Sequence, residues 1–118
     1  MANKSRRSDV TTAERAAAYD ALEPLLNAMF REFQELSKKK PDGVLNKNKI
    51  NVVNRLLIDV QKVLDDEPNR SYLDLLNEDD VPQYSDVVIT LGQHVAAMAA
   101  FHSRYHGRSE FSYGWAIG

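Results

Sequence analysis

Apolar residues recur at three- and four-residue intervals along most of this 118-residue chain, the spacing that lines one side of an α-helix. The first such stripe follows Thr11 and Glu14, which have the spacing of a capping box, and it runs to about Ser37. Its members are Ala18, Leu22, Leu25, Leu26, Met29, Phe33 and Leu36. The stripe predicts a helical unit with one side facing a core.

Pro24 interrupts this first stripe, because proline lacks the N–H that would bond the carbonyl four residues back. A kink or a restart is therefore expected between Asp20 and Pro24, which would divide the unit into two helices. Asp20 and Ala21 are the N-cap candidates for the second segment, with Pro24 in its tolerant first turn. The stretch 37–43, SKKKPDG, ends the unit because Pro-Asp-Gly favours a turn.

Two further stripes predict long helices. One helix is expected to be capped by Asn46 or Asn48 and to run to about Asp65, on the stripe Ile50, Val53, Leu57, Val60 and Leu64. The other is expected to begin between residues 80 and 85 and to end at Gly107, on the stripe Tyr84, Val87, Val88, Leu91, Val95, Met98, Phe101 and Tyr105. Between them, residues 71–76 predict a short capped helix.

The last residues follow a different pattern, in which large and small side chains alternate. Phe111, Tyr113, Trp115 and Ile117 are separated by Ser112, Gly114 and Ala116. In an extended chain this alternation puts every large side chain on one face. The segment after Gly107 is therefore expected to be extended rather than helical.

Together these patterns predict an all-α fold: an antiparallel bundle of four main helices plus one short helix, with an extended aromatic C-terminal tail. The predicted organisation is a mobile basic N-terminal arm over residues 1–10, a helical bundle domain over 11–107 and the tail over 108–118.

Composition supports an ordinary globular domain, with 43% hydrophobic and 27% charged residues. The sequence contains neither an apolar run of about 18 residues nor an apolar stretch behind the basic N-terminus, so we expect no membrane span, no secretory signal and a cytoplasmic location. The absence of cysteine excludes disulfides and thiolate nucleophiles.

Sequence signatures of catalysis are missing: there is no phosphate-binding glycine loop, HExxH, EF-hand loop or nucleophile elbow. The best metal candidates are His102 and His106, one helical turn apart, with Glu110 as a possible third ligand. Such a pair recurs by chance and also suits a helix C-terminus, where a protonated imidazole interacts with the helix dipole. We therefore expect no metal or other cofactor, and a metal-dependent helical enzyme stays a second alternative.

Charge is unevenly distributed along the chain. Residues 1–55 carry eleven Lys/Arg and seven Asp/Glu, whereas residues 56–86 carry two and nine. The main basic surface comprises Lys38, Lys39, Lys40, Lys47 and Lys49, with Lys4, Arg6 and Arg7 of the arm as possible additions. This surface raises the alternative of a nucleic-acid-associated protein. It lacks interleaved aromatic residues, and the overall pI of 5.9 is low for such a protein.

The leading functional hypothesis is a non-enzymatic helical protein–protein interaction module, either a homodimer or a small subunit of a larger assembly. Its partner-binding candidates are Phe111, Tyr113, Trp115 and Ile117, because a solvated terminus would not normally expose so many large apolar residues. Folding of the tail onto its own bundle and docking on a partner chain both stay open.

Overall fold

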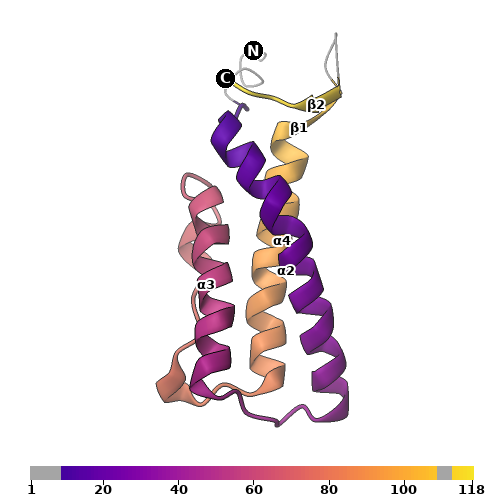
Figure 1. Ribbon diagram of the computed structural model, residues 1–118. Coiled ribbons are helices and arrows are strands. Elements are labelled where there is room, and N and C mark those ends of the chain that lie inside the picture. The colour runs from indigo at the N-terminus through magenta and orange to yellow at the C-terminus, as the bar shows by residue number, and fades with distance from the viewer. Residues whose placement is uncertain (1–8, 109–112) are drawn as a thin grey trace.

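The computed structural model describes residues 9–108 and 113–118. It is mostly helical, with α2 (Ala13–Lys39), α3 (Lys47–Val63) and α4 (Tyr84–Tyr105) lying side by side in an elongated body of 50 × 23 × 23 Å (Figure 1). A small antiparallel sheet of β1 (His106–Arg108) and β2 (Tyr113–Trp115) lies at the end where α4 finishes. No described helix is both long and apolar enough to cross a membrane.

Helix α2 continues through Pro24, so the expected division of the first unit into two helices is wrong. Tyr19 and Leu26, on either side of the proline, are both buried in the core. Their packing holds one continuous helix despite the hydrogen bond that Pro24 cannot make. The described chain therefore has three α-helices, and the prediction of four main helices is wrong.

The start of α2 also differs from the expected capping box. Thr12 is the N-cap, and its side chain accepts a hydrogen bond of 3.1 Å from the backbone N–H of Arg15. Thr11, the predicted cap, is buried and instead forms a parallel bridge with Ile117. The N–H of Thr11 donates to Ala116 O at 2.9 Å, and Gly118 donates to Thr11 O at 3.0 Å.

Helix α3 and the core stripes agree with the sequence analysis. Asn46 caps α3 by accepting a 2.8 Å hydrogen bond from the N–H of Lys49. The α3 stripe is buried throughout, and every member of the α4 stripe belongs to the core or packs against it. The three- and four-residue spacing thus identified the inward faces of both helices.

The segment between α3 and α4 returns along the bundle, so α3 and α4 run parallel and only α2 is antiparallel to them (Figure 1). This segment holds two 3₁₀-helices, η1 (Arg70–Tyr72) and η2 (Glu78–Asp80), in place of the short helix predicted over 71–76. Asn54 of α3 exchanges two 2.9 Å hydrogen bonds with the backbone of Leu76. The Asn54 side chain thereby satisfies the backbone N–H and carbonyl of Leu76, so this residue does not need the hydrogen bonds of a helix.

Helix α4 ends at Tyr105, so the expected glycine cap at Gly107 is wrong. His106 is already extended, with φ −126° and ψ 134°, and Gly107 belongs to β1, where it pairs with Gly114. The prediction of an extended segment after the last helix is confirmed for residues 113–115, which form β2. The N–H of Ala116 then donates to Tyr105 O at 2.6 Å, which joins the tail to the end of α4.

Candidate functional site

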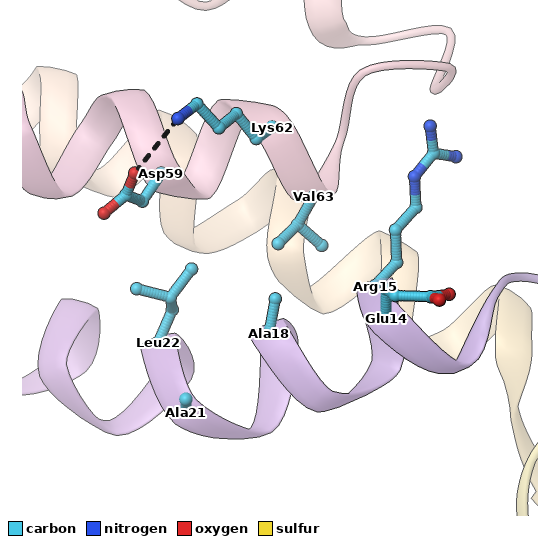
Figure 2. A pocket seen from close by; sticks show the side chains of 8 residues that line it. All are labelled: Glu14, Arg15, Ala18, Ala21, Leu22, Asp59, Lys62 and Val63. Carbon is cyan, nitrogen blue, oxygen red and sulfur yellow. Dashed lines mark ion pairs between the residues drawn. The ribbon is translucent and has the colours of Figure 1, made fainter.

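An open groove of about 400 Å³ lies between the first half of α2 and the second half of α3 (Figure 2). The α2 wall supplies an apolar surface and the α3 wall adds one valine; these residues are Ala18, Ala21, Leu22 and Val63. The rim is charged and comprises Glu14, Arg15, Asp59 and Lys62. An apolar floor with a charged rim is the usual composition of a surface that receives another chain.

The chain itself packs across the other two sides of the bundle, which keep smaller pockets of about 70 Å³ between α2 and α4 and about 260 Å³ between η1 and α4. Between α3 and α4, the returning segment is tied to Asn54 and buries Leu73 in the core. Between α2 and α4, the rings of Tyr19 and Phe101 stack with centroids 5.8 Å apart. The groove, by contrast, is lined by residues of α2 and α3 alone.

Apolar surface extends beyond the groove on both walls. Leu25 is 58% exposed and Val52 is 51% exposed. Leu25 lies seven residues after Ala18, and Val52 lies seven residues before Asp59, so each shares the groove-facing side of its helix. The expectation that Leu25 faces the core is therefore wrong.

The rim charges make only weak contacts within the chain. Arg15 pairs with Asp66 at 2.9 Å, and Lys62 with Asp59 at 3.7 Å. At least one member of each pair is more than 70% exposed, and such surface pairs stabilise a fold by about 0–1 kcal/mol. The rim can therefore exchange its internal pairs for pairs with another molecule at little cost.

The tail residue Trp115 packs on its own bundle. The centroid of its ring lies 5.0 Å from the ring centroid of Tyr19, 5.7 Å from that of Phe101 and 5.0 Å from that of His106. Its Nε1 donates to the carboxylate of Asp20 at 3.2 Å. The indole therefore joins the start of α2 to the end of α4.

The other three partner-binding candidates are placed differently. Ile117 is 47% exposed beside the start of α2. Tyr113 is described only as backbone of β2, and Phe111 lies outside the described residues. Ile117 is thus the candidate whose described side chain is available to another molecule.

The two histidines proposed as metal candidates are neighbours. The rings of His102 and His106 stack with centroids 4.3 Å apart, and both rings contact Trp115. Within residues 9–108 and 113–118, no group of three or more metal-ligating side chains forms, and Glu110 lies outside these ranges. The stack is an aromatic contact beneath the tail.

The five lysines of the basic surface gather at one end of the bundle, since Lys38 to Lys40 end the α2 segment and Lys47 and Lys49 begin α3. Lys38 pairs with Glu35 at 3.1 Å. The bridge between Val44 and Gln83 brings acidic η2 to the same end. Residues 1–8 of the arm lie outside the described part, and α2 begins at the opposite end of the bundle (Figure 1).

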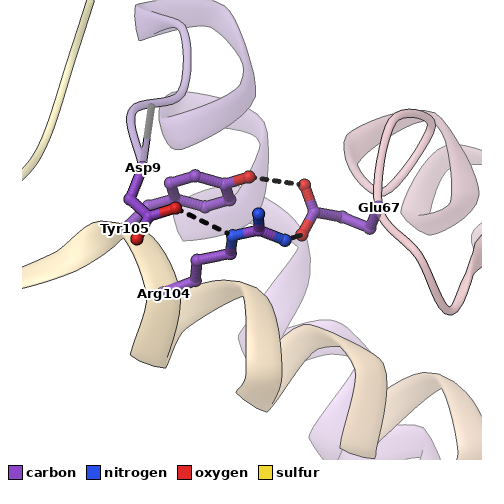
Figure 3. Close-up of polar contacts among 4 residues, drawn as sticks. All are labelled: Asp9, Glu67, Arg104 and Tyr105. Atoms are coloured by element: carbon purple, nitrogen blue, oxygen red, sulfur yellow. Dashed lines mark hydrogen bonds and ion pairs between the residues drawn. The ribbon is translucent and has the colours of Figure 1, made fainter. Parts of the chain in front are cut away.

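A polar network joins three segments at the end of α4 (Figure 3). Tyr105 Oη donates to Glu67 at 2.8 Å, and Arg104 pairs with Glu67 at 3.5 Å and with Asp9 at 3.4 Å. Burial raises the pKa of Tyr105, and the neighbouring Glu67 carboxylate raises it further. The Glu67 side chain is only 7% exposed, and its contacts join the loop after α3 to the end of α4.

A second buried polar contact, which no sequence pattern indicates, joins Gln61 of α3 to His94 of α4, with their side-chain nitrogens 3.0 Å apart. Both residues are buried. Burial lowers the pKa of His94, since the charged imidazolium would lose its hydration. The neutral ring therefore links two helices and is not available as a metal ligand at the surface.

The groove was equally hidden in the sequence, because its walls come from helices joined only through a loop. The width of the first apolar stripe was the available indication: Leu25 and Leu26 are adjacent, and adjacent positions point about 100° apart on a helix. Comparison of the chain with protein-family models, with curated proteins and with solved structures found no match.

Proposed function

We propose that this protein is a non-enzymatic helical interaction module that binds another protein chain through the α2/α3 groove. The observation that carries the proposal is the groove itself, whose apolar α2 wall of Ala18, Ala21 and Leu22 is followed on the same helix by Leu25, which is 58% exposed. Apolar surface surrounded by a polar rim is the composition usual for protein–protein contacts. The complementary ligand is an amphipathic helix, whose apolar face fits a groove between two helices.

The buried polar groups support a binding role over catalysis. Glu67, Tyr105 and Arg104 hold segments of the chain together, and Gln61 and His94 hold α3 to α4. The ionisable side chains nearest the core are therefore engaged in contacts between structural elements. The groove surface itself consists of apolar side chains and exposed charged side chains, a composition that suits recognition of another chain.

The tail has a supporting place in this proposal. Trp115 fixes the start of α2 against the end of α4, which keeps the α2 wall of the groove in position. Ile117 extends the exposed apolar surface beside Val10, which is 39% exposed. A partner long enough to pass the end of α2 would meet these two residues.

Site-specific photo-cross-linking tests the proposal. A benzophenone amino acid replaces Ala21 on the groove wall or, as the control, Ala100 on the exposed surface of α4. In the native host, the Ala21 position is expected to give a discrete protein adduct that disappears when Leu25→Asp is added. Equal labelling from both positions, or no adduct from Ala21, would contradict the proposal.

A further inference from the structure

Residues 69–76, which include η1, form the η1 cover, a segment that packs on α4 beside His94. Three of its residues line one pocket together with three residues of α4, namely Asn69, Tyr72 and Leu73 with Gln93, Ala96 and Ala97. Those α4 residues lie on both sides of His94 along the helix, and His94 is 0% exposed. The η1 cover therefore helps to keep water from the imidazole ring.

Few interactions hold the η1 cover in place. Leu73 is the single buried residue among residues 69–76, whereas the Tyr72 side chain is 77% exposed. The side chain of Asn54 on α3 holds the backbone of Leu76 with two hydrogen bonds of 2.9 Å. A segment with so few buried apolar contacts opens locally at a lower free energy than the whole chain unfolds.

Two polar atoms of the η1 cover also favour opening. Asn69 Oδ1 and Arg70 Nε are buried and have no hydrogen-bond partner among the described residues. A buried polar group without a partner loses its hydration and gains no hydrogen bond in return. Both atoms are hydrated again when the cover moves away from α4, which lowers the stability of the closed form relative to the open one.

A second ring proton on His94 has no acceptor while the η1 cover is closed. Nδ1 lies 2.8 Å from the carbonyl oxygen of Thr90, so Nδ1 carries the proton of the neutral ring. The second proton would go to Nε2, which lies 3.0 Å from Nε2 of Gln61, itself a donor. Two donors would then face each other in a site that water does not reach.

Two charged side chains of the η1 cover act on this ring. Burial lowers the pKa of His94, and the hydrogen bond to the Thr90 carbonyl opposes that effect. The Arg70 guanidinium lowers the pKa further, whereas the Asp74 carboxylate raises it to a smaller extent. A doubly protonated His94 is thus repelled by the cation that the cover itself supplies.

We infer that the η1 cover is an acid-sensitive device, which moves away from α4 when His94 gains its second proton while α2, α3 and α4 stay folded. Opening hydrates the imidazolium and separates it from Arg70. It also hydrates the two polar atoms that have no partner in the closed form. The inference is independent of the α2/α3 groove and of what that groove binds.

The equilibrium between the closed and the open cover depends on pH. In the open form His94 is solvated and titrates near 6.5, whereas in the closed form its pKa is lower. The open form therefore binds more protons between those two values. The equilibrium constant for opening is constant above about pH 6.5 and rises by up to about tenfold per pH unit below it.

Amide hydrogen exchange of the wild-type chain, followed by NMR, tests the cover. The reporters are the hydrogen-bonded N–H groups of Tyr72, Leu73 and Leu76. Their exchange, divided by the intrinsic rate at each pH, should accelerate about threefold to tenfold from pH 7.5 to 5.5 and depend little on urea. Exchange at Leu26 and Phe33, buried in α2, should show the strong urea dependence of global unfolding.

Variants test which charges control the opening. Gln61→Met/His94→Met should abolish the acceleration at low pH. Arg70→Met should reduce it, because the charge that repels the imidazolium is gone, and Asp74→Asn should extend it to lower pH. Asp79→Asn, at an exposed position of η2, is the matched control for Asp74 and should leave it unchanged.

Three results would overturn the inference. Reporter exchange with the same urea dependence as Leu26 and Phe33 would mean that the cover opens only with the whole chain. Weakly urea-dependent exchange that does not change with pH would remove the link to a proton. Acceleration that persists in Gln61→Met/His94→Met would assign that proton to another residue.

Discussion

Gln61 Nε2 lies 3.0 Å from His94 Nε2 in the buried contact between α3 and α4. The other ring nitrogen, Nδ1, lies 2.8 Å from the carbonyl oxygen of Thr90, which can only accept a hydrogen bond. Nδ1 therefore carries the proton, and Nε2 accepts from the Gln61 amide. The contact satisfies the neutral form of His94 and offers no acceptor for a second ring proton.

This arrangement makes the free energy of unfolding depend on pH. An unfolded histidine titrates near 6.5, whereas burial lowers the pKa of folded His94. Between those two pKa values the unfolded chain binds more protons, so stability is full above pH 6.5 and falls as the pH drops toward the folded pKa. The slope from this residue reaches at most about 1.4 kcal/mol per pH unit. Urea unfolding followed by circular dichroism across this range measures it.

The double variant Gln61→Met/His94→Met provides the control, because it removes both polar groups while keeping side chains that fill the space. Its free energy of unfolding should depend less on pH than that of the wild type in the window just below 6.5. Identical pH profiles for the two proteins would show that His94 does not titrate with folding.

Trp115 is predicted to stabilise the fold by joining α2 to α4. Trp115→Ala should lower the free energy of unfolding by about 2 kcal/mol, below the 3–5 kcal/mol typical of a fully buried tryptophan, because this ring is partly exposed. Chemical denaturation measures the loss. In the wild type, fluorescence of this single tryptophan should follow the same transition as circular dichroism.

Ile117→Ala is the comparison for Trp115, since Ile117 belongs to the same tail and is 47% exposed. It should change the free energy of unfolding by no more than about 0.5 kcal/mol. If Trp115→Ala were equally mild, the contacts of the indole with Tyr19 and Phe101 would not contribute to stability.

Tyr105 and Glu67 are predicted to be energetically coupled. Tyr105→Phe keeps the ring but removes the donor to Glu67, and it should destabilise the fold by about 1–3 kcal/mol, because the carboxylate is only 7% exposed. A double-mutant cycle with Glu67→Ala, which removes the acceptor, should give a coupling energy of at least about 0.5 kcal/mol. Tyr72→Phe, at a ring that is 77% exposed, serves as the control, and a coupling energy of zero would refute the pairing.

The parts of the fold that the sequence predicted are those set by local periodicity. The stripe from Ile50 to Leu64 identified α3, and Asn46 was one of two expected caps. Alternation of large and small residues predicted extended backbone at Tyr113 to Trp115. In each case the determining interactions lie within a few residues along the chain, so spacing alone suffices.

The predictions failed where contacts between residues far apart in the sequence determine the local structure. Pro24 should divide a helix by its local chemistry, yet burial of Tyr19 and Leu26 against α4 keeps α2 whole. The same packing turns Leu25 outward. Periodicity shows how wide an apolar face is, but it does not show how much of that face the chain itself covers.

The polar contacts were beyond sequence reasoning for a related reason. Gln61 and His94 are 33 positions apart, and Tyr105 and Glu67 are 38 apart. No spacing rule relates residues on separate elements whose crossing is unknown. The path of residues 64–83, which makes α3 and α4 parallel, determines both contacts.

Val81 has the left-handed backbone conformation, with φ 49° and ψ 65°. A β-branched side chain fits this region poorly, at a cost of about 1–2 kcal/mol, whereas asparagine tolerates it. The Val81 side chain is 58% exposed, so its replacement loses little packing. Val81→Asn should therefore raise the free energy of unfolding by about 1 kcal/mol, as measured by urea denaturation.

Val44→Asn separates the backbone effect of Val81 from simple removal of exposed apolar surface. Val44 is 50% exposed and lies at the same end of the bundle, but its φ is not positive. That substitution should bring no gain in stability, because there is no left-handed strain to relieve. Equal stabilisation by both substitutions would mean that loss of a surface valine, rather than the conformation of Val81, accounts for the change.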